Sequence, residues 1–469
     1  MVKSQSINGS YNSNKIAWIT IGCFTTFVSL LLLIGAGKLL IIAFPLGAVG
    51  VGAFLYFCYP LHYTSFTLWM WFLSSLIRRM IDYQSGYLTP GPWTLTALLV
   101  TLISSLTFAR HLTTAHKKGG FPFVICCGSV FYSFLVGLIY NPKNRAILQF
   151  LYWLAPILFS FHIFANWRDY PRYRQNFQQT FVWGTLVMGV YGVWQYLVAP
   201  EWERFFLTNI DAYSFGQPEP FGIRVFSTMD APQTFSNAIA AGLIILLTTK
   251  GLSPYLIASF GFLTFLLSRA RAAWMGWFLG MIIFLPSLRP HWQMRIVIGT
   301  LIASLMIVPI AQIEPFASTI SARLESFSNI ENDTSLEARS EGYRKSLDAA
   351  LSELTGKGMG NSEGALGNDS GILKVLFSFG WFGAIPYGGG ILLLFLTTFQ
   401  SSQASSDPFF SAARAIAFGT FAQIGFNPPL EAAIGMIFWG FLGISIAGKK
   451  YYLSEMKSQK LYQNIKPIK

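Results

Sequence analysis

Arginine residues beside predicted helix ends are the side chains of this sequence best suited to chemistry. Arg224 stands in the segment GIRVFSTMDAP, just before a helix that we expect to begin near Asp230 and Pro232. Asp230 suits the N-cap position, and Pro232 suits the first helical turn. The free N–H groups of a helix start attract phosphate, and a guanidinium binds phosphate through two parallel hydrogen bonds. The segment is therefore a candidate pyrophosphate site, although an arginine that merely snorkels at a helix end would give the same pattern.

A tight turn between two apolar runs contains two further arginines. Arg269 and Arg271 lie in the sequence Ser268-Arg-Ala-Arg. Ionisable residues placed in this way in a membrane protein usually have a function. Arg269 closes the first apolar run and is the better candidate, both for catalysis and for binding phosphate. Arg271 either binds phosphate or simply anchors the next helix.

The longest polar stretch of the chain, 313–370, is predicted to contain a helix. Thr334 and Glu337 have the spacing of a capping box, and apolar residues then recur every three or four positions until Gly356. This pattern predicts an amphipathic lid helix over about 335–355, about five turns long. The lid helix either rests on the bundle or grips a substrate.

The same stretch supplies two candidates for catalysis. The lid helix carries Arg339, with Arg344 as a secondary candidate, unless both simply belong to a solvated face. At the end of the stretch, Asp369 either caps the next helix or acts as a catalytic base. The other secondary candidates are Arg78, Arg79, Asp82 and Asp230.

Metal and disulfide chemistry are not expected. The five histidines are scattered, and none forms a ligand-spaced pair with nearby carboxylates. All four cysteines fall inside apolar runs, where a thiol usually behaves as a small hydrophobic group. We therefore expect no cofactor and no metal ion.

The elements that position these residues are apolar helices. The 469 residues are 53% hydrophobic and only 11% charged, and a bilayer core needs about 20 apolar residues per helix. The sequence predicts an all-α integral membrane protein: one polytopic domain over 1–469, a bundle of about 12–14 transmembrane helices with a long helical extracytoplasmic loop. The first apolar run, 16–36, is expected to be a transmembrane helix that is retained and not cleaved as a signal peptide. Whether the run 62–80 crosses the whole membrane is left open. The runs are 16–36, 39–58, 62–80, 92–109, 121–140, 147–166, 178–198, 228–248, 252–268, 272–287, 295–312, 372–398, 408–425 and 430–447.

The basic residues fix the expected orientation, because Lys and Arg are retained on the cytoplasmic side. With both termini cytoplasmic, the inner segments hold 18 of the 33 basic residues but only three of the 20 acidic ones. The segments 199–227 and 313–370 then face the outside of the plasma (inner) membrane, and 448–469 is a basic cytoplasmic tail. The net charge of +13 is thus a topology signal and does not indicate nucleic-acid binding.

The sequence around these residues resembles the O-antigen ligase and O-antigen polymerase superfamily of membrane glycosyltransferases. Ala270 stands where that family usually has glycine, and Arg78-Arg-Met-Ile-Asp82 is similar to a stretch in exopolysaccharide-polymerase relatives. The segments that carry the resemblance are Arg224-Val-Phe-Ser-Thr-Met-Asp-Ala-Pro, Leu267-Ser-Arg-Ala-Arg, Arg339 with Gly358-Met-Gly360, and Asp369-Ser-Gly-Ile-Leu with Phe379-Gly-Trp-Phe-Gly383.

The resemblance implies transfer of a glycan from an undecaprenyl-pyrophosphate carrier to an acceptor hydroxyl on the outer face, without metal or nucleotide sugar. Ligases of the family place a histidine in the long loop as the candidate base. This sequence has no histidine on its expected outer face, and Asp369 stands at the closing position instead. We therefore expect a polymerase of exopolysaccharide or O-antigen repeat units. Its expected partners are the lipid-linked donor, a glycan or lipid acceptor, membrane lipids, a flippase and a chain-length regulator.

Two other functions fit parts of the pattern. An O-antigen ligase would transfer the glycan to a lipid-core acceptor. A transporter of small anions such as bicarbonate would usually keep ionisable residues or broken helices near the bilayer midplane. The predicted centres of the helices here are nearly free of charge, which favours catalysis at one face.

Overall fold

The chain folds almost entirely into α-helices, as the sequence predicts. In the computed structural model the described residues are 7–87, 92–115, 117, 119–210, 213–251, 253–288, 290, 293–294, 296–298, 344, 346–361, 370–399 and 407–465. Among them there is no β-strand, only one isolated antiparallel bridge between Gly216 and Ile223. The helices account for the apolar runs because a helix satisfies its own backbone hydrogen bonds in a lipid environment.

The helices follow the predicted runs closely. Each run up to residue 287 and from 372 onward is largely helical, while most of 295–312 lies outside the described residues. The elements in chain order are α1 (Ile7–Leu33), α2 (Gly37–Cys58), α3 (Pro60–Ser85), η1 (Pro92–Leu95), α4 (Thr96–Leu102), α5 (Ser105–Ala115), α6 (Phe121–Tyr140), α7 (Lys143–Ala165), η3 (Trp167–Asp169), α8 (Tyr170–Val198), α9 (Glu201–Asn209), η4 (Tyr213–Phe215), α10 (Pro232–Leu246), α11 (Ser253–Leu267), α12 (Arg271–Phe284), η5 (Leu285–Ser287), α16 (Gly371–Phe399), α17 (Pro408–Phe421), η9 (Ala422–Gly425) and α18 (Ala432–Ile465).

Eight helical stretches of the described chain are long and apolar enough to cross a membrane. They comprise α1, α2, α4 with α5, α6, α7, α8 with η3, α16 and α18. Helices α10 and α11 are apolar but have only 15 residues each. Helix α3 has 26 residues, but Arg78, Arg79 and Asp82 lie within its last two turns and lower its hydropathy. The eight stretches indicate a multi-pass membrane protein.

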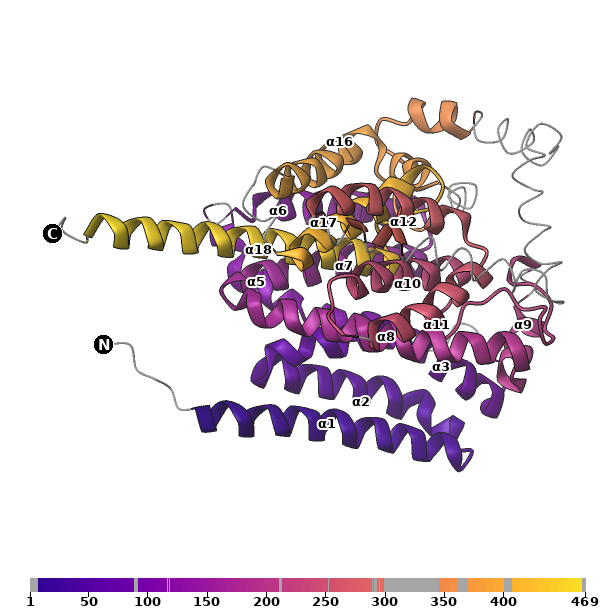
Figure 1. The fold of residues 1–469 in the computed structure, drawn as a ribbon. Coiled ribbons are helices and arrows are strands. Elements are labelled where there is room, and N and C mark those ends of the chain that lie inside the picture. Colours follow the sequence, from indigo (N-terminus) through magenta and orange to yellow (C-terminus); the bar gives the residue numbers. More distant parts are fainter. Residues whose placement is uncertain are drawn as a thin grey trace.

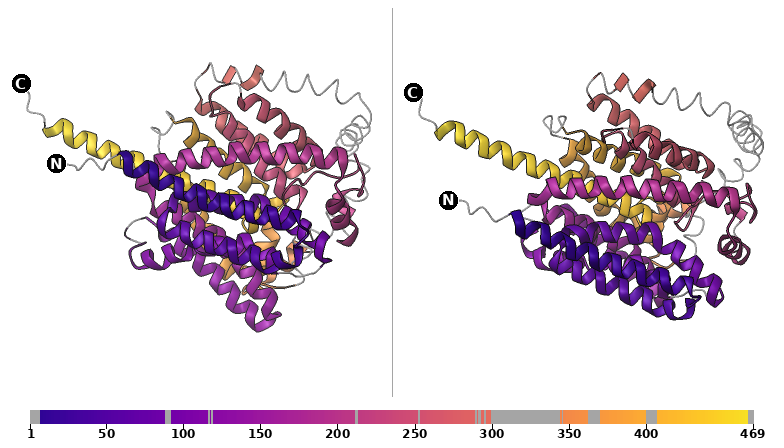
Figure 2. Two further views of the ribbon diagram at one scale, coloured as in Figure 1. Left: turned by 90° about the horizontal axis from the view of Figure 1, so that it is seen from below. Right: turned by 60° about the horizontal axis from the view of Figure 1, so that its bottom comes forward.

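The bundle is layered, with the chain ends on one side. Figure 1 shows α1 and α2 at one edge, α8 and α11 in the middle and α16 at the opposite edge, and in the view from below α1 and α2 lie in front of the rest of the bundle (Figure 2, left). Among the described helices, the most extensive packing is between α7 and α18, α6 and α16, α12 and α17, α8 and α11, and α2 and α3. Helix α18 extends beyond the bundle on the side where both termini lie.

Aromatic packing joins the three helices α7, α16 and α18. Trp153 of α7 lies 5.0 Å from the ring of Phe379 and 5.6 Å from that of Tyr387, both of α16. Tyr387 in turn contacts Trp439 of α18, and all four side chains are fully buried. Buried aromatic pairs of this kind add about 0.5–1.5 kcal/mol each beyond the area that they bury. The cluster therefore holds α7, α16 and α18 side by side within the bundle.

The predicted long loop falls largely outside the described residues. Residues 313–343, which include Arg339, and residues 362–369, which include Asp369, lie outside the described part of the chain. Within the predicted lid helix, 346–352 is helical, and Arg344 is helical and exposed.

Candidate functional site

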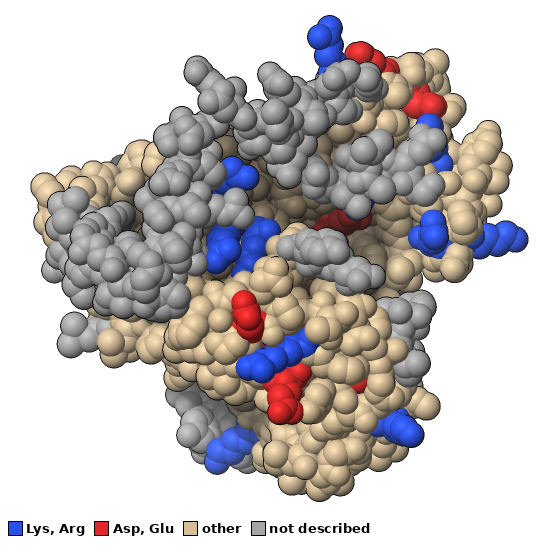
Figure 3. Space-filling view, turned by 90° about the vertical axis from the view of Figure 1, so that its right-hand side faces the viewer, with Lys and Arg blue, Asp and Glu red and all other residues tan. Residues whose placement is uncertain are grey.

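A cavity of about 520 Å³ opens where several helix ends meet. Its size lies within the range of small-molecule sites, about 300–1,000 Å³. Seen from the side opposite the termini, basic and acidic side chains gather around a recess in the surface (Figure 3). The polar residues that line the cavity are Ser74, Ser75, Arg78, Thr94, Arg145, Gln149, Tyr152, Asp230, Asn361, Lys374 and Glu431.

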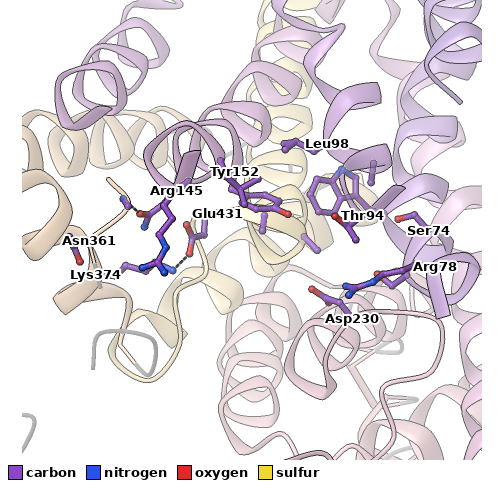
Figure 4. Close-up of a pocket in the computed structure, with 18 residues that line it drawn as sticks. Ser74, Arg78, Thr94, Leu98, Arg145, Tyr152, Asp230, Asn361, Lys374 and Glu431 are labelled. Carbon is purple, nitrogen blue, oxygen red and sulfur yellow. Dashed lines mark hydrogen bonds and ion pairs between the residues drawn. The ribbon is translucent and has the colours of Figure 1, made fainter. Parts of the chain in front are cut away.

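The charged side chains form two groups at opposite sides of the cavity (Figure 4). Arg145, Lys374 and Glu431 lie together on one side, and we call them the basic group. Arg78 and Asp230 face each other on the other side. Asp82 forms an ion pair with Arg78, and we call these three residues the acidic group. The ring of Tyr152 from α7 lies between the two groups.

The basic group is built on the starts of three helices. Lys374, in the first turn of α16, forms an ion pair with Glu431, the residue before α18. Arg145, in the first turn of α7, is exposed and has no acidic partner among the described residues. The N-terminal ends of helices carry partial positive charge, so α7, α16 and α18 add to the positive potential of this side. An anion such as phosphate would be stabilised here.

The acidic group holds one arginine between two carboxylates. Arg78 pairs with Asp82, with 3.3 Å between Nε and Oδ2, and the Asp82 side chain is fully buried. Asp230 is exposed at the cavity, and neighbouring protein atoms partly desolvate its carboxyl group, which forms a hydrogen bond with Thr234. This desolvation raises the pKa of Asp230, although Thr234, nearby backbone N–H groups and Arg79 act in the opposite direction. A carboxyl group in such a place can accept a proton near neutral pH more readily than an ordinary aspartate can.

Arg79 holds the segment that leads into Asp230. Its guanidinium is 1% exposed and donates hydrogen bonds to the carbonyl oxygens of Met229, at 2.6 Å, and Ser227, at 2.5 Å. Its Nε lies 2.8 Å from Oε2 of Glu203, which is fully buried on α9. This contact is an ion pair whose hydrogen bond is poorly aligned. Arg79 also covers the ring of Phe226, at 4.8 Å from its centroid, so the backbone before Asp230 has little freedom.

A glycine-rich segment forms one wall of the cavity. Gly356, Gly358 and Gly360 all have positive φ, between 73° and 86°. The N–H of Lys357 donates to Phe377 in α16, and that of Met359 donates to Ser133 in α6. Asn141 donates from its amide to the carbonyls of Lys357 and Met359, and Gly360 donates to the side chain of Gln149. The segment therefore lies between α6, α7 and α16 and places Gly360 and Asn361 at the cavity.

Gly358→Ala should disrupt the packing of this glycine-rich segment against α6. An added Cβ would lie 2.2 Å from the backbone nitrogen of Gly137, and the φ of 73° is itself unfavourable for alanine. We expect the free energy of unfolding to fall by at least about 2 kcal/mol, measured as a lower melting temperature in detergent. Gly388→Ala is the matched control, because a Cβ there meets nothing within 4 Å and alanine favours a helix. Equal melting temperatures for the two variants would contradict the assigned packing.

The predicted arginines at 224, 269 and 271 do not line this cavity. Arg224 donates hydrogen bonds to the carbonyl oxygens of Ser268, Arg269 and Ser214 and so ties its loop to the turn before α12. Arg269 adopts a left-handed backbone conformation, with φ of 53°. A role for these three residues in binding pyrophosphate stays a prediction.

Comparison of the sequence with models of known protein families and with curated proteins gives no match. The site must therefore be interpreted from its own geometry. Of the secondary candidates, Arg78 and Asp230 line the cavity, while Arg79 and Asp82 lie directly behind them.

Sequence reasoning did not single out the basic group. Arg145 and Lys374 are basic residues on the expected outer side, and the positive-inside rule makes such residues exceptional. The same criterion selected Arg269 and could have selected these two residues. Glu431, by contrast, stands in the first turn of a predicted helix, shortly after two prolines, and gives no separate signal.

Proposed function

We propose that this protein is a membrane glycosyltransferase that polymerises oligosaccharide units carried on a lipid pyrophosphate. One observation carries the proposal: three cations and two carboxylates line a single cavity at one end of an apolar helical bundle. A substrate with a long lipid tail, a pyrophosphate and a glycan needs an apolar surround, cationic groups and polar groups close together. The resemblance of the sequence to O-antigen polymerases and ligases supports the same function.

The chemistry needs a group that neutralises the departing pyrophosphate and a group that accepts the proton of the acceptor hydroxyl. Arginine and lysine side chains can stabilise charge that develops on phosphate oxygens. A carboxylate can act as the base. Among the described residues no cluster of three metal-ligating side chains occurs, and the proposed reaction uses cationic side chains for the role that a metal ion plays elsewhere.

The proposed topology has both termini in the cytoplasm and about 12–14 membrane passes. The cavity then lies on the extracytoplasmic side, because α18 runs from it toward the side of the termini (Figure 1). The basic tail 448–469 would lie at the cytoplasmic surface, where anionic lipids attract lysine. A lipid-linked donor would reach the cavity from the outer leaflet of the plasma membrane.

A deletion strain of the source organism tests the proposal. We expect the long polysaccharide chains to disappear and lipid-linked single repeat units to accumulate, as seen by electrophoresis and by mass spectrometry of extracted lipids. A ligase would give the opposite lipid pool, long chains that remain on the carrier. A transporter would alter neither pool and would instead take up labelled bicarbonate in proteoliposomes. Complementation with the wild-type gene is the control, and either alternative pattern would overturn the proposal.

A further inference from the structure

We propose that the two groups in the cavity divide the reaction between them. Arg145 and Lys374 bind the pyrophosphate of the lipid-linked donor, and Asp230 accepts the proton from the acceptor hydroxyl. This inference rests on the proposed function and assigns roles within its site. It depends on the placement, charge and contacts of the six side chains that form the two groups.

The charge balance differs between the two sides of the cavity. The basic group contains two cations and one carboxylate, so it keeps one positive charge, and three helix starts add to it. The acidic group contains one cation, Arg78, beside Asp82 and Asp230, so it keeps one negative charge while both carboxylates are ionised. A pyrophosphate carries several negative charges and is therefore stabilised on the basic side and repelled from the acidic side.

Asp230 meets the geometric needs of a base. It is accessible from the cavity, and Arg79 fixes the backbone immediately before it through the carbonyls of Ser227 and Met229. The charged and titratable groups around it are Arg78, Arg79 and Asp82 of α3 and Tyr152 of α7. The desolvation that raises its pKa makes it a stronger base than an ordinary aspartate.

Glu431 is less suited to the same task. It forms an ion pair with Lys374, and its side chain is only 12% exposed. A carboxylate held by an ammonium group is a weaker base, since the positive charge favours the ionised form. Glu431 is therefore a positioning residue that holds the Lys374 ammonium at the cavity wall.

The step can be written with every atom accounted for. The oxygen of the acceptor hydroxyl attacks the anomeric carbon of the donor sugar, and its proton passes to the Asp230 carboxylate. The bond between the anomeric carbon and the pyrophosphate oxygen breaks, and its electron pair leaves with the lipid pyrophosphate. Arg145 and Lys374 stabilise that charge, and Asp230 afterwards releases its proton to water.

Two measurements on Asp230→Asn and Arg145→Ala separate the roles. The first is binding of undecaprenyl pyrophosphate to the purified full chain in detergent. The second is formation of long polysaccharide in the complemented deletion strain. Asp230→Asn should bind the lipid within about threefold of wild type but lose polymerisation at least about 100-fold, the effect of removing a general base. Arg145→Ala should weaken lipid binding at least about tenfold. Glu219→Gln, which removes an exposed carboxylate from the 199–227 segment, should leave both unchanged.

Each outcome decides a different point. If Asp230→Asn weakens lipid binding as much as Arg145→Ala does, or keeps its polymerisation, the division of roles is wrong while the proposed function stands. If wild-type protein fails to bind undecaprenyl pyrophosphate, the proposed function itself fails. Asp230→Glu adds a test that folding defects cannot mimic. Compared with Asp230→Asn, this variant should recover part of the polymerisation activity. Its rate, like that of the wild type, should fall at acid pH, and the fall should begin at a pH above the usual pKa range of aspartate.

Discussion

Arg79→Met should lower the free energy of unfolding by about 3–5 kcal/mol, because it leaves the carboxylate of Glu203 buried without a counter-charge. Both side chains are 1% exposed or less, and they lie 2.8 Å apart. The variant also loses two hydrogen bonds, to the carbonyls of Ser227 and Met229. The Ser227 carbonyl would keep only the longer hydrogen bond from the Gln195 amide, at 3.4 Å. We expect the segment before Asp230 to loosen, so polymerisation should fall together with stability.

The predicted loss of stability in Arg79→Met can be measured as a lower melting temperature of the purified protein in detergent, with the fluorescence of its 14 tryptophans as the signal. Arg172→Met removes an exposed arginine of α8 and is the matched control, with an expected change within about 0.5 kcal/mol. The double variant Arg79→Met Glu203→Gln should recover part of the loss, since it no longer buries an unpaired charge. If Arg79→Met melts at the temperature of Arg172→Met, the ion pair does not stabilise the fold.

The pH dependence of the single variant has a definite sign. Burial raises the pKa of Glu203, and Arg79 acts against this rise. Without Arg79 the folded-state pKa should rise further above the unfolded value, so folding favours the protonated carboxyl. The stability deficit of Arg79→Met should therefore be smaller at acid pH, where only the lost hydrogen bonds remain, and should grow as the pH rises through the range between the two pKa values.

The positions of the helices could be predicted from the sequence, but their pairing could not. Apolar length alone locates a membrane helix, since no other local structure satisfies the backbone in lipid. Pairing depends on close backbone contacts that composition does not reveal. Gly276 of α12 and Gly419 of α17 show this, because a Cβ on Gly419 would lie 2.3 Å from the carbonyl oxygen of Gly276. The sequence shows only that both residues are glycines in apolar runs.

The candidate site could be predicted only in part, for a similar reason. Asp230 is predicted from its place at a helix start and Arg78 from the resemblance of its stretch to exopolysaccharide-polymerase relatives, and both line the cavity. Arg224 is predicted from the same helix start, but its guanidinium bonds to backbone carbonyls. An arginine that holds a turn and an arginine that faces a cavity have the same local sequence. Only the tertiary contacts of α7, α16 and α18 bring Arg145 and Lys374 together.

Arg145→Glu should abolish binding of the lipid pyrophosphate, with a loss in affinity of at least about 100-fold. The substitution changes the basic group from two cations and one carboxylate to one cation and two carboxylates. At about 4 Å and an effective dielectric constant of about 20, each unit charge contributes about 4 kcal/mol to the interaction with one phosphate charge. The substitution changes the charge by two units, so about a third of the resulting change of about 8 kcal/mol equals the energy of a 100-fold loss, about 2.7 kcal/mol.

Lys143→Glu provides the comparison that separates direct binding from long-range attraction. Lys143 is exposed in the same first turn of α7, and it does not line the cavity. Both variants change the net charge by the same amount and place a carboxylate at the same helix start. Added salt screens charges beyond about 10 Å at 0.1 M, so any loss in Lys143→Glu should vanish as salt is raised. The loss in Arg145→Glu should persist, because a pyrophosphate in contact with the side chain is not screened. Equal affinities for the two variants at high salt would place the pyrophosphate elsewhere than at Arg145.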